Sequence, residues 1–393
     1  MAHLCHPTSP AAPATPLDDD DLLADIILRL PPHPHSLSRA SLVCKRWRRL
    51  IRDPGFLRRL RAFHRTPPVL GFFHNSPCVP RFVCAQGSPG RIARAAGALR
   101  RDGDDGMWWF VDCRHGRALL RARDWADLLV WDPVTAERRQ VSVPRRVLAG
   151  ASDCNATVVC PSAAAAGDCH SSPFDVVVVF TGQGRAFACV YSSLTGSWGE
   201  LVSTQIALPL PPCELSEEPG ALVGDALYWL LGDRGILEFH LGDQRLALVE
   251  RPLETFSVYK RNIRVVRSEG GGLGLAAAKN FSVHLWAREI GHDGAAKWVL
   301  HREIDLYTLL ALPLTQPRVG SIPVWISGLG EDGNVVFLRT MVGIFVVWLE
   351  TMQFKNLTSS VLMKTVYPYA SFYVPEVLIY AFDMGGFAWT RAL

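Results

Sequence analysis

The sequence has no long run of apolar residues. A membrane-spanning helix needs about 20 of them, and the longest runs here, such as residues 342–349, have the length of a strand. The first 16 residues have neither a basic start nor an apolar stretch, so they lack the pattern of a secretory signal. Their prolines and alanines predict a disordered tail over residues 1–16. We therefore expect no membrane partner and a location in the cytoplasm, the nucleus or both.

The sequence also lacks the cysteine spacing of a zinc site. Five residues separate Cys154 from Cys160, and eight separate Cys160 from Cys169, whereas zinc-binding cysteines usually stand two to four residues apart. The ten cysteines show no disulfide framework. Outside the secretory route we expect them to be reduced and mostly buried. No metal ion is predicted.

Motifs for catalysis and for cofactor binding are missing as well. Residues 270–276 have the spacing of a dinucleotide-binding loop, but that loop must open a helix in a parallel sheet, and a strand-like run follows here. These glycines are better interpreted as a turn between strands. A phosphate-binding loop, a Gly-x-Ser-x-Gly elbow and a His-Glu-x-x-His motif are all absent. His115 stands alone, which favours a turn or surface role. We predict no cofactor and no enzyme activity.

Residues 17–63 predict three short helices. Asp18–Asp21 offer helix-capping side chains, and apolar residues then recur at helical spacing up to Leu30. Ser36 can cap a second helix that carries an apolar stripe from Leu37 to Ile51. A third, shorter helix is predicted around residues 56–63. Three helices of this size have too little core to be stable alone, so they should need a partner.

The order of these features resembles the F-box. The resemblance rests on the leucine-rich first helix, the Leu-Pro that ends it, and Val-Cys-Lys-x-Trp-Arg-x-Leu-Ile followed by Asp-Pro-x-Phe. It covers about 47 residues; Asp18 replaces the proline usual in the family, and the stretch at residues 32–35 is slightly longer than usual. The resemblance implies an F-box over residues 17–65 that binds a Skp-type adaptor and, through it, a cullin. The adaptor-binding residues that it implies are Leu17, Leu22, Leu23, Ile26, Leu30, Pro31, Leu37, Val43, Cys44, Trp47 and Leu50.

The positive charge of the chain is concentrated in the same helices. The net charge is only +4, yet residues 39–65 hold ten Lys or Arg residues and one acid, Asp53. Such a cluster can bind nucleic acid, or it can be the solvated outer face of the helices. Aromatic residues for base stacking are not interleaved with it, so the solvated face is favoured and a nucleic-acid partner is not expected.

Residues 66–393 predict a large all-β domain. Short β-rich runs alternate with Gly, Pro, Asp and Ser turns, as at residues 226–231, 236–240 and 335–340. A degenerate repeat aligns five aromatic residues at intervals of 60, 48, 47 and 62 residues; they are Trp131, Tyr191, Phe239, Trp286 and Trp348. Propeller blades have about 40–50 residues. We expect a β-propeller of six to eight blades, with a sandwich pair or an irregular barrel as the alternative.

This second half also resembles the propeller that follows the F-box in many plant F-box proteins. The phrases that carry the resemblance begin at Asp112 and Leu129. The whole chain is then of mixed class, with a small α-helical F-box before a large β-propeller. The function implied is a substrate-recruiting, non-catalytic subunit of a Skp-cullin-F-box ubiquitin ligase. The target and the residues that bind it are unknown; the alternatives are nucleic-acid binding by the basic helices or a propeller scaffold that acts outside any ligase.

Overall fold

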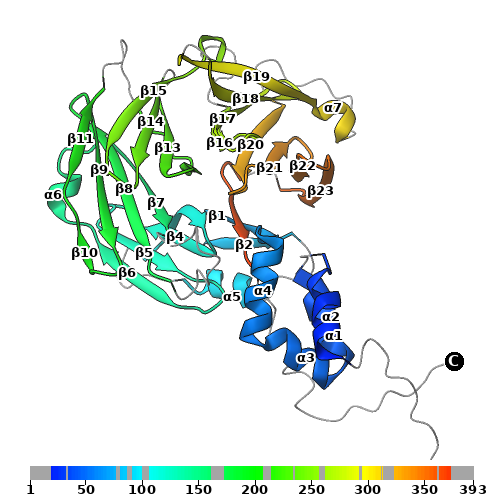
Figure 1. The fold of residues 1–393 in the computed structure, drawn as a ribbon. Helices are drawn as coiled ribbons and strands as arrows, with labels where there is room; N and C mark the ends of the chain where they lie inside the picture. Colours follow the sequence, from blue (N-terminus) through cyan, green and yellow to red (C-terminus); the bar gives the residue numbers. More distant parts are fainter. Residues whose placement is uncertain are drawn as a thin grey trace, which may run out of the picture. The chain divides into compact units, whose positions relative to one another are not determined.

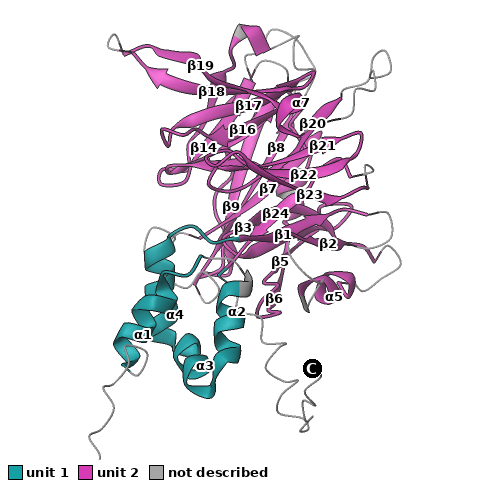
Figure 2. Cartoon of the chain, turned by 90° about the vertical axis from the view of Figure 1, so that its right-hand side faces the viewer, with its two compact units in different colours: residues 1–68, 372–393 teal, residues 69–371 magenta. Residues whose placement is uncertain are grey.

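The computed structural model describes residues 19–31, 34–76, 80–85, 91–99, 106–160, 172–206, 214–232, 235–255, 262–291, 294–310, 312, 323–360 and 363–372. The chain divides into two compact units (Figure 2). Unit 1 contains residues 1–68 and 372–393, and unit 2 contains residues 69–371. The predicted tail at residues 1–16 and the predicted contact Leu17 lie outside the described residues. The domain limits predicted above remain predictions.

Unit 1 is helical in its described part. Its helices are α1 (Asp20–Leu28), α2 (Pro34–Val43), α3 (Lys45–Arg52) and α4 (Pro54–His64). Asp19 caps α1, as the aspartate run predicted, because its carboxylate accepts hydrogen bonds from the backbone N–H groups of Asp21 (2.8 Å) and Leu22 (3.2 Å). A small core is formed by Leu23, Ala24, Ile27, Leu28, Ala40, Ile51, Phe56 and Leu60.

Three details of the helical prediction are wrong. The predicted second helix is two helices, because Cys44 has an extended backbone (φ −161°, ψ 171°) that ends α2 and starts α3. Ser36 does not cap it, since α2 already begins at Pro34, a residue whose fixed φ suits a first helical turn. The last helix is the longest of the four, with 11 residues, because Asp53 ends α3 and at once caps α4 by accepting from the N–H of Phe56 at 2.9 Å.

Unit 2 consists of six antiparallel sheets in its described residues, arranged around a centre as the blades of a propeller (Figure 1). Four have the strand order of the chain: β3 (Trp109–Arg114) to β6 (Arg138–Ser142), β12 (Ala221–Val223) to β15 (Leu246–Glu250), β16 (Ile263–Arg267) to β19 (Ala296–Asp305), and β20 (Val324–Leu329) to β23 (Gln353–Thr358). A fifth contains β7 (Asp153–Val159), β8 (Asp175–Gly182), β9 (Arg185–Ser192), β10 (Ser197–Trp198) and β11 (Val202–Gln205).

The remaining strands of these four sheets also have defined bounds. They are β4 (Arg117–Arg121), β5 (Asp127–Trp131), β13 (Ala226–Leu231), β14 (Gly235–His240), β17 (Leu273–Lys279), β18 (Ser282–Ile290), β21 (Val335–Thr340) and β22 (Gly343–Trp348). Short helices interrupt the unit at α5 (Arg91–Gly97), α6 (Arg145–Leu148), η2 (Leu253–Thr255) and α7 (Leu306–Leu309). None of the helices in the described part of the chain combines the length and the apolar character that crossing a membrane requires.

The sixth sheet joins the two ends of unit 2. Its order is β2 (Arg81–Cys84), β1 (Val69–His74), β24 (Tyr367–Ala370), so strands from opposite ends of the unit pair side by side. β24 also contacts β3 on one side and β20 on the other. This pairing closes the ring, because it holds the first and last segments of the unit in one blade. The sequence predicted the propeller but not its blade number or its closure.

The aromatic repeat is confirmed by the strand order. Trp131, Tyr191, Phe239, Trp286 and Trp348 lie on β5, β9, β14, β18 and β22, which are the third strands of five successive sheets. Apolar clusters fill the space between neighbouring sheets. The repeat therefore reflects an aromatic residue on the third strand of five blades, although Trp348 packs toward the following sheet and Tyr191, Phe239 and Trp286 pack toward the preceding one. The glycines at residues 270–272 form the turn between β16 and β17, as predicted, and Gly271 has a φ of +81° there.

Candidate functional site

The predicted adaptor residues divide into an exposed group and a buried group. Leu22 (49% exposed) and Ile26 (44%) lie one turn apart on α1, and Val43 (61%) ends α2. Pro31 and Cys44 are exposed as well. We name Leu22, Ile26, Pro31, Val43 and Cys44 the exposed strip. Exposed apolar side chains mark a docking surface where they form a contiguous patch.

The other predicted contacts belong to the interior of the helical unit. Leu23 has no exposed surface, so the docking surface that we consider below leaves it out. The four half-buried residues pack against the helical core and keep part of their surface; they are Leu30, Leu37, Trp47 and Leu50. Sequence reasoning did not name Leu42 (38% exposed), and it used Phe63 (52% exposed) to predict the third helix but did not count it among the contacts.

The basic residues of unit 1 line an open groove of about 1040 Å³ between α1, α3 and α4. Part of their charge is neutralised, because Arg46 pairs with Asp20 at 2.7 Å and Arg59 with Asp25 at 2.5 Å. Trp47 is half-buried and packs against the core. These contacts favour the solvated face over a nucleic-acid site.

Unit 2 contains a second candidate site, formed by polar side chains on or beside the inner strands of the blades. Three asparagines bridge alternate pairs of neighbouring blades. The Asn262 side chain donates to the carbonyl of Val324 (2.8 Å) and accepts from the N–H of Ile326 (2.9 Å). Asn155 donates to the carbonyls of Ser216 (2.7 Å) and Glu218 (2.8 Å), and Asn75 makes the same kind of two-way contact with Phe110.

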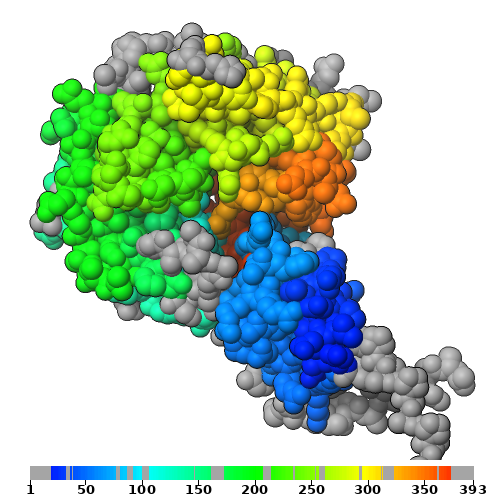
Figure 3. Space-filling model, in the orientation of Figure 1, coloured from blue at the N-terminus to red at the C-terminus, as the bar shows by residue number. Residues whose placement is uncertain are grey.

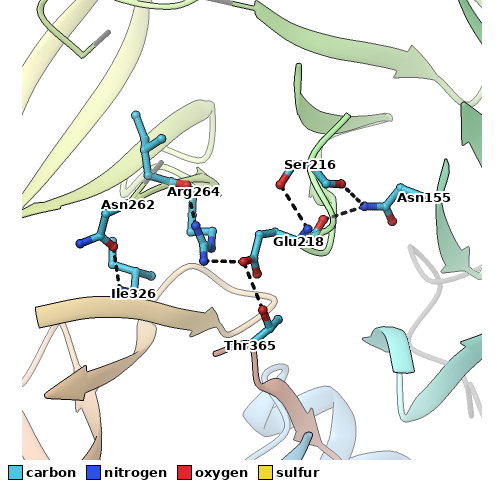
Figure 4. A network of polar contacts seen from close by, with 8 residues as sticks. Asn155, Ser216, Glu218, Asn262, Arg264, Ile326 and Thr365 are labelled. Atoms are coloured by element: carbon cyan, nitrogen blue, oxygen red, sulfur yellow. Dashed lines mark hydrogen bonds and ion pairs between the residues drawn. The ribbon is translucent and has the colours of Figure 1, made fainter. Parts of the chain in front are cut away.

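An ion pair joins the blades between two of these asparagine bridges. The Arg264 guanidinium donates to the Glu218 carboxylate at 2.7 Å, and the Thr365 hydroxyl donates to the same oxygen at 3.1 Å (Figure 4). Both ionic side chains are largely buried, at 7% and 21% exposure. Burial raises the pKa of Glu218, while Arg264 opposes that shift. A buried carboxylate with two donors is a rigid joint between β16, the segment before β12 and the segment before β24.

A further charged group lies around the turn between β3 and β4. Arg114 donates to the carbonyl of Gly220 at 2.6 Å and lies 3.6 Å from the Asp112 carboxylate. The backbone N–H of His115 donates to Glu331 at 2.8 Å. Burial raises the pKa of Asp112 and that of Glu331, and it lowers the pKa of His115 to about 4. The prediction that His115 stands alone is therefore wrong; it occupies a turn, as predicted, but beside the half-buried carboxylate of Glu331.

Sequence reasoning missed this set of polar residues, although a signal was present. Asp112 and Arg114, Asn155 and Thr157, and Asn262 and Arg264 each stand two residues apart. A spacing of two places both side chains on one face of a strand, and a polar pair inside an apolar run marks a strand that faces a polar centre. Among the described residues no group of three or more potential metal ligands gathers. Of the three cysteines whose spacing was compared with that of zinc ligands, Cys154 lies in β7, Cys160 directly follows it, and Cys169 lies outside the described residues.

Sequence comparisons identify both parts of the chain. The family model "F-box-like" matches residues 20–62. The model "F-box protein AT5G49610-like, beta-propeller" matches residues 109–376, which is more than half of the chain. No curated protein matches the sequence.

Many solved structures match this chain at low sequence identity. One is the extracellular domain of the two-component system BT4673 from B. thetaiotaomicron, with 14% identity, a TM-score of 0.32, and coverage of 64% of this chain and 27% of that chain. Another is the WD40 domain of SCAP from fission yeast, with 13% identity, a TM-score of 0.34, and coverage of 65% and 52%. A third is a functionally unknown protein from Desulfotomaculum acetoxidans, with 12% identity, a TM-score of 0.38, and coverage of 73% and 79%.

This chain thus spans less than two thirds of the first two solved structures. The two family models, in contrast, match in the order that the units have along the chain, with helices first and blades second. The chain therefore belongs to the F-box protein family whose AT5G49610-like β-propeller follows an F-box-like domain.

Proposed function

We propose that the protein is the substrate-recruiting subunit of a Skp-cullin-F-box ubiquitin ligase. Its helical unit binds a Skp-type adaptor, which joins it to a cullin, and its propeller binds a target protein. The observation that carries the proposal is the exposed strip, because Leu22, Ile26 and Val43 remain open to water in a unit that the F-box-like model matches. Binding of an adaptor removes this apolar surface from water, and that gain drives the association.

The chain contributes binding and no catalysis in this proposal. Holding a target next to a ubiquitin-charged enzyme raises its effective concentration there. The buried charges of unit 2 support a structural role, since Arg264, Glu218 and Arg114 each hold a neighbouring blade. A location in the cytoplasm, the nucleus or both also remains part of the proposal.

The test is co-purification of a Skp-type adaptor with the full chain. We expect the triple variant Leu22→Ala, Ile26→Ala, Val43→Ala to lose adaptor at least tenfold, because the few side chains that dominate an interface cost about 2 kcal/mol or more when truncated. These side chains are exposed, so the unit should keep its fold. Trp47 is less useful for the test, because it also packs against the helical core.

The control is a triple variant of exposed apolar residues in unit 2, Leu194→Ala, Met341→Ala, Phe354→Ala, which removes a similar exposed surface. It should retain adaptor at the wild-type level. Equal adaptor recovery from both triple variants would contradict the proposed docking surface. Failure of the wild-type chain to bind any Skp-type adaptor would contradict the ligase role.

A further inference from the structure

The open groove of unit 1 has a strong excess of positive charge. It lies between α1, α3 and α4, and α1 (dark blue) and α4 (lighter blue) lie side by side at the surface of this unit in the space-filling view (Figure 3). Seven basic side chains line the groove, but only three acidic ones. Two of these acids are already engaged, because Asp20 pairs with Arg46 and Asp53 accepts from the N–H of Phe56. Asp21 alone cannot balance the remaining positive charge.

Four basic residues of the groove are exposed and have no ion-pair partner among the described residues; they are Lys45, Arg49, Arg52 and Arg58. Helix α3 contains no acid that could separate its positive charges. Lys45 stands four residues before Arg49, and Arg48 stands four residues before Arg52, so like charges are neighbours along the helix surface. Such pairs repel and destabilise the helix. A bound carboxylate group would relieve this repulsion.

The groove and the exposed strip lie on different sides of α1. Ala24 lines the groove, whereas Leu22 and Ile26 of the strip stand two residues before and after it. Two residues of an α-helix are separated by about 200° around its axis, so Ala24 points nearly opposite to both. A partner that docks on Leu22 and Ile26 therefore faces the other side of α1. The groove is a separate surface of the same unit.

The lining of the groove suits a peptide better than a nucleic acid. Phe56 is the aromatic residue among the lining residues, and it is 4% exposed, so no ring is open for base stacking. A nucleic acid carries a phosphate on every nucleotide, which Asp21 and its acidic neighbours would repel. A peptide can space its carboxylates to avoid them. Leu50, which is half-buried at the groove, offers an apolar contact for one of its side chains.

We propose that this groove is a second protein-binding surface of unit 1 and that it takes an acidic segment of a partner protein. The carboxylates of the segment accept charge-assisted hydrogen bonds from Arg49, Arg52 and Arg58, and one apolar side chain contacts Leu50. The arginines are exposed, so the attraction should weaken as the salt concentration rises. This inference goes beyond the proposed function, because the groove can bind its partner whether or not the exposed strip binds an adaptor.

The experiment measures the fluorescence anisotropy of labelled octapeptides with the full chain. The acidic probe carries four Glu and one Leu in a Gly/Ser background, and the matched probe has Gln in place of each Glu. A single-stranded RNA of eight nucleotides with the same label is the nucleic-acid probe. We expect the Gln peptide to bind at least tenfold more weakly than the acidic peptide, and the RNA to bind more weakly than the acidic peptide as well.

Protein variants then locate the site. The groove variant Arg49→Gln, Arg52→Gln, Arg58→Gln should weaken the acidic peptide at least tenfold, because its carboxylates lose their partners. Replacing the same three residues by Lys keeps the charge and should weaken it less than threefold.

The matched control replaces three exposed arginines of unit 2 by Gln and should change nothing; they are Arg123, Arg138 and Arg267. All the replaced side chains are exposed, so the variants should keep the helical circular dichroism of the wild type.

The outcomes separate the groove from the adaptor surface. The strip variant Leu22→Ala, Ile26→Ala, Val43→Ala should keep the acidic peptide while it loses adaptor, and the groove variant should do the reverse. If no peptide binds, or if the groove and control variants bind it equally, the groove is only a solvated face and the inference is wrong. RNA binding as tight as that of the acidic peptide would also overturn it. Failure of the wild-type chain to bind an adaptor contradicts the ligase role alone.

Discussion

The two units of this protein place their apolar and polar residues in opposite ways. Unit 1 leaves Leu22, Ile26 and Val43 exposed and keeps its ion pairs at the surface. Unit 2 buries Arg264 and Asp112 beside its inner strands and packs apolar residues between its sheets. The contrast indicates that unit 1 is completed by a partner, whereas unit 2 is completed by its own closure. The same kinds of contact should therefore have different energies in the two units.

The largest effect on the free energy of unfolding is expected when a buried ion pair is broken, compared with an exposed one. Arg264→Ala leaves the buried Glu218 carboxylate without its guanidinium, which should cost about 3–5 kcal/mol of the free energy of unfolding. Arg245→Ala is the control, because Arg245 and Asp243 pair at 3.4 Å with both side chains more than 60% exposed, and such pairs contribute little. Chemical unfolding of unit 2 measures both. Equal losses of stability in the two variants would show that the buried pair of Arg264 and Glu218 does not hold the blades together.

The neighbours Leu22 and Leu23 test the contrast within unit 1. Leu23→Ala should destabilise the helices by about 2–5 kcal/mol, because its side chain is fully buried and truncation leaves a cavity. Leu22→Ala should change stability by less than about 0.5 kcal/mol and weaken adaptor binding instead. Unfolding followed by the circular dichroism of the helices measures the loss of stability in each variant, and a separate binding assay measures its affinity for the adaptor. A stability loss at Leu22 as large as that at Leu23 would mean that the strip is part of the core.

The smallest of the three effects depends on pH. The pKa of His115 falls to about 4 in the folded protein from 6.5, because burial and Arg114 disfavour its charged form. As the pH falls from 6.5 to 4, the unfolded chain takes up a proton here and the folded chain does not, so the folded state loses stability over this window. The fall of the pKa from 6.5 to about 4 corresponds to at most roughly 3–4 kcal/mol.

His115→Asn should remove this loss, and asparagine also tolerates the backbone φ of +54° at this position. The raised pKa values of Asp112 and Glu331 act in the opposite direction, since the folded state then binds protons more readily than the unfolded state. The measurement is therefore the difference between variant and wild type from pH 7 to 4. Parallel stability curves would show that His115 does not titrate in this window.

The elements that were predicted well are those with local signals. Residues 226–231 and 335–340 were predicted as strands with the bounds that β13 and β21 have, because their apolar runs end at Gly-Asp or other turn residues. Asp19 and Asp53 cap helices through contacts two or three residues along the chain. The break at Cys44 was missed, since the apolar stripe continues through it and only the packing of α2 against α3 shows the turn.

The sequence alone determined the order of helices and blades, the aromatic repeat and the presence of an apolar surface on the helices, because each depends on residues close together in the chain. It could not determine which of Leu22 and Leu23 faces water, how β24 closes the ring, or that Glu218, Arg264 and Thr365 meet. Thr365 and Glu218 lie 147 positions apart, and the closure pairs Val69 with Ala370, near the two ends of unit 2. Only the tertiary structure decides these contacts, since a side chain carries no local signal of a partner in another blade.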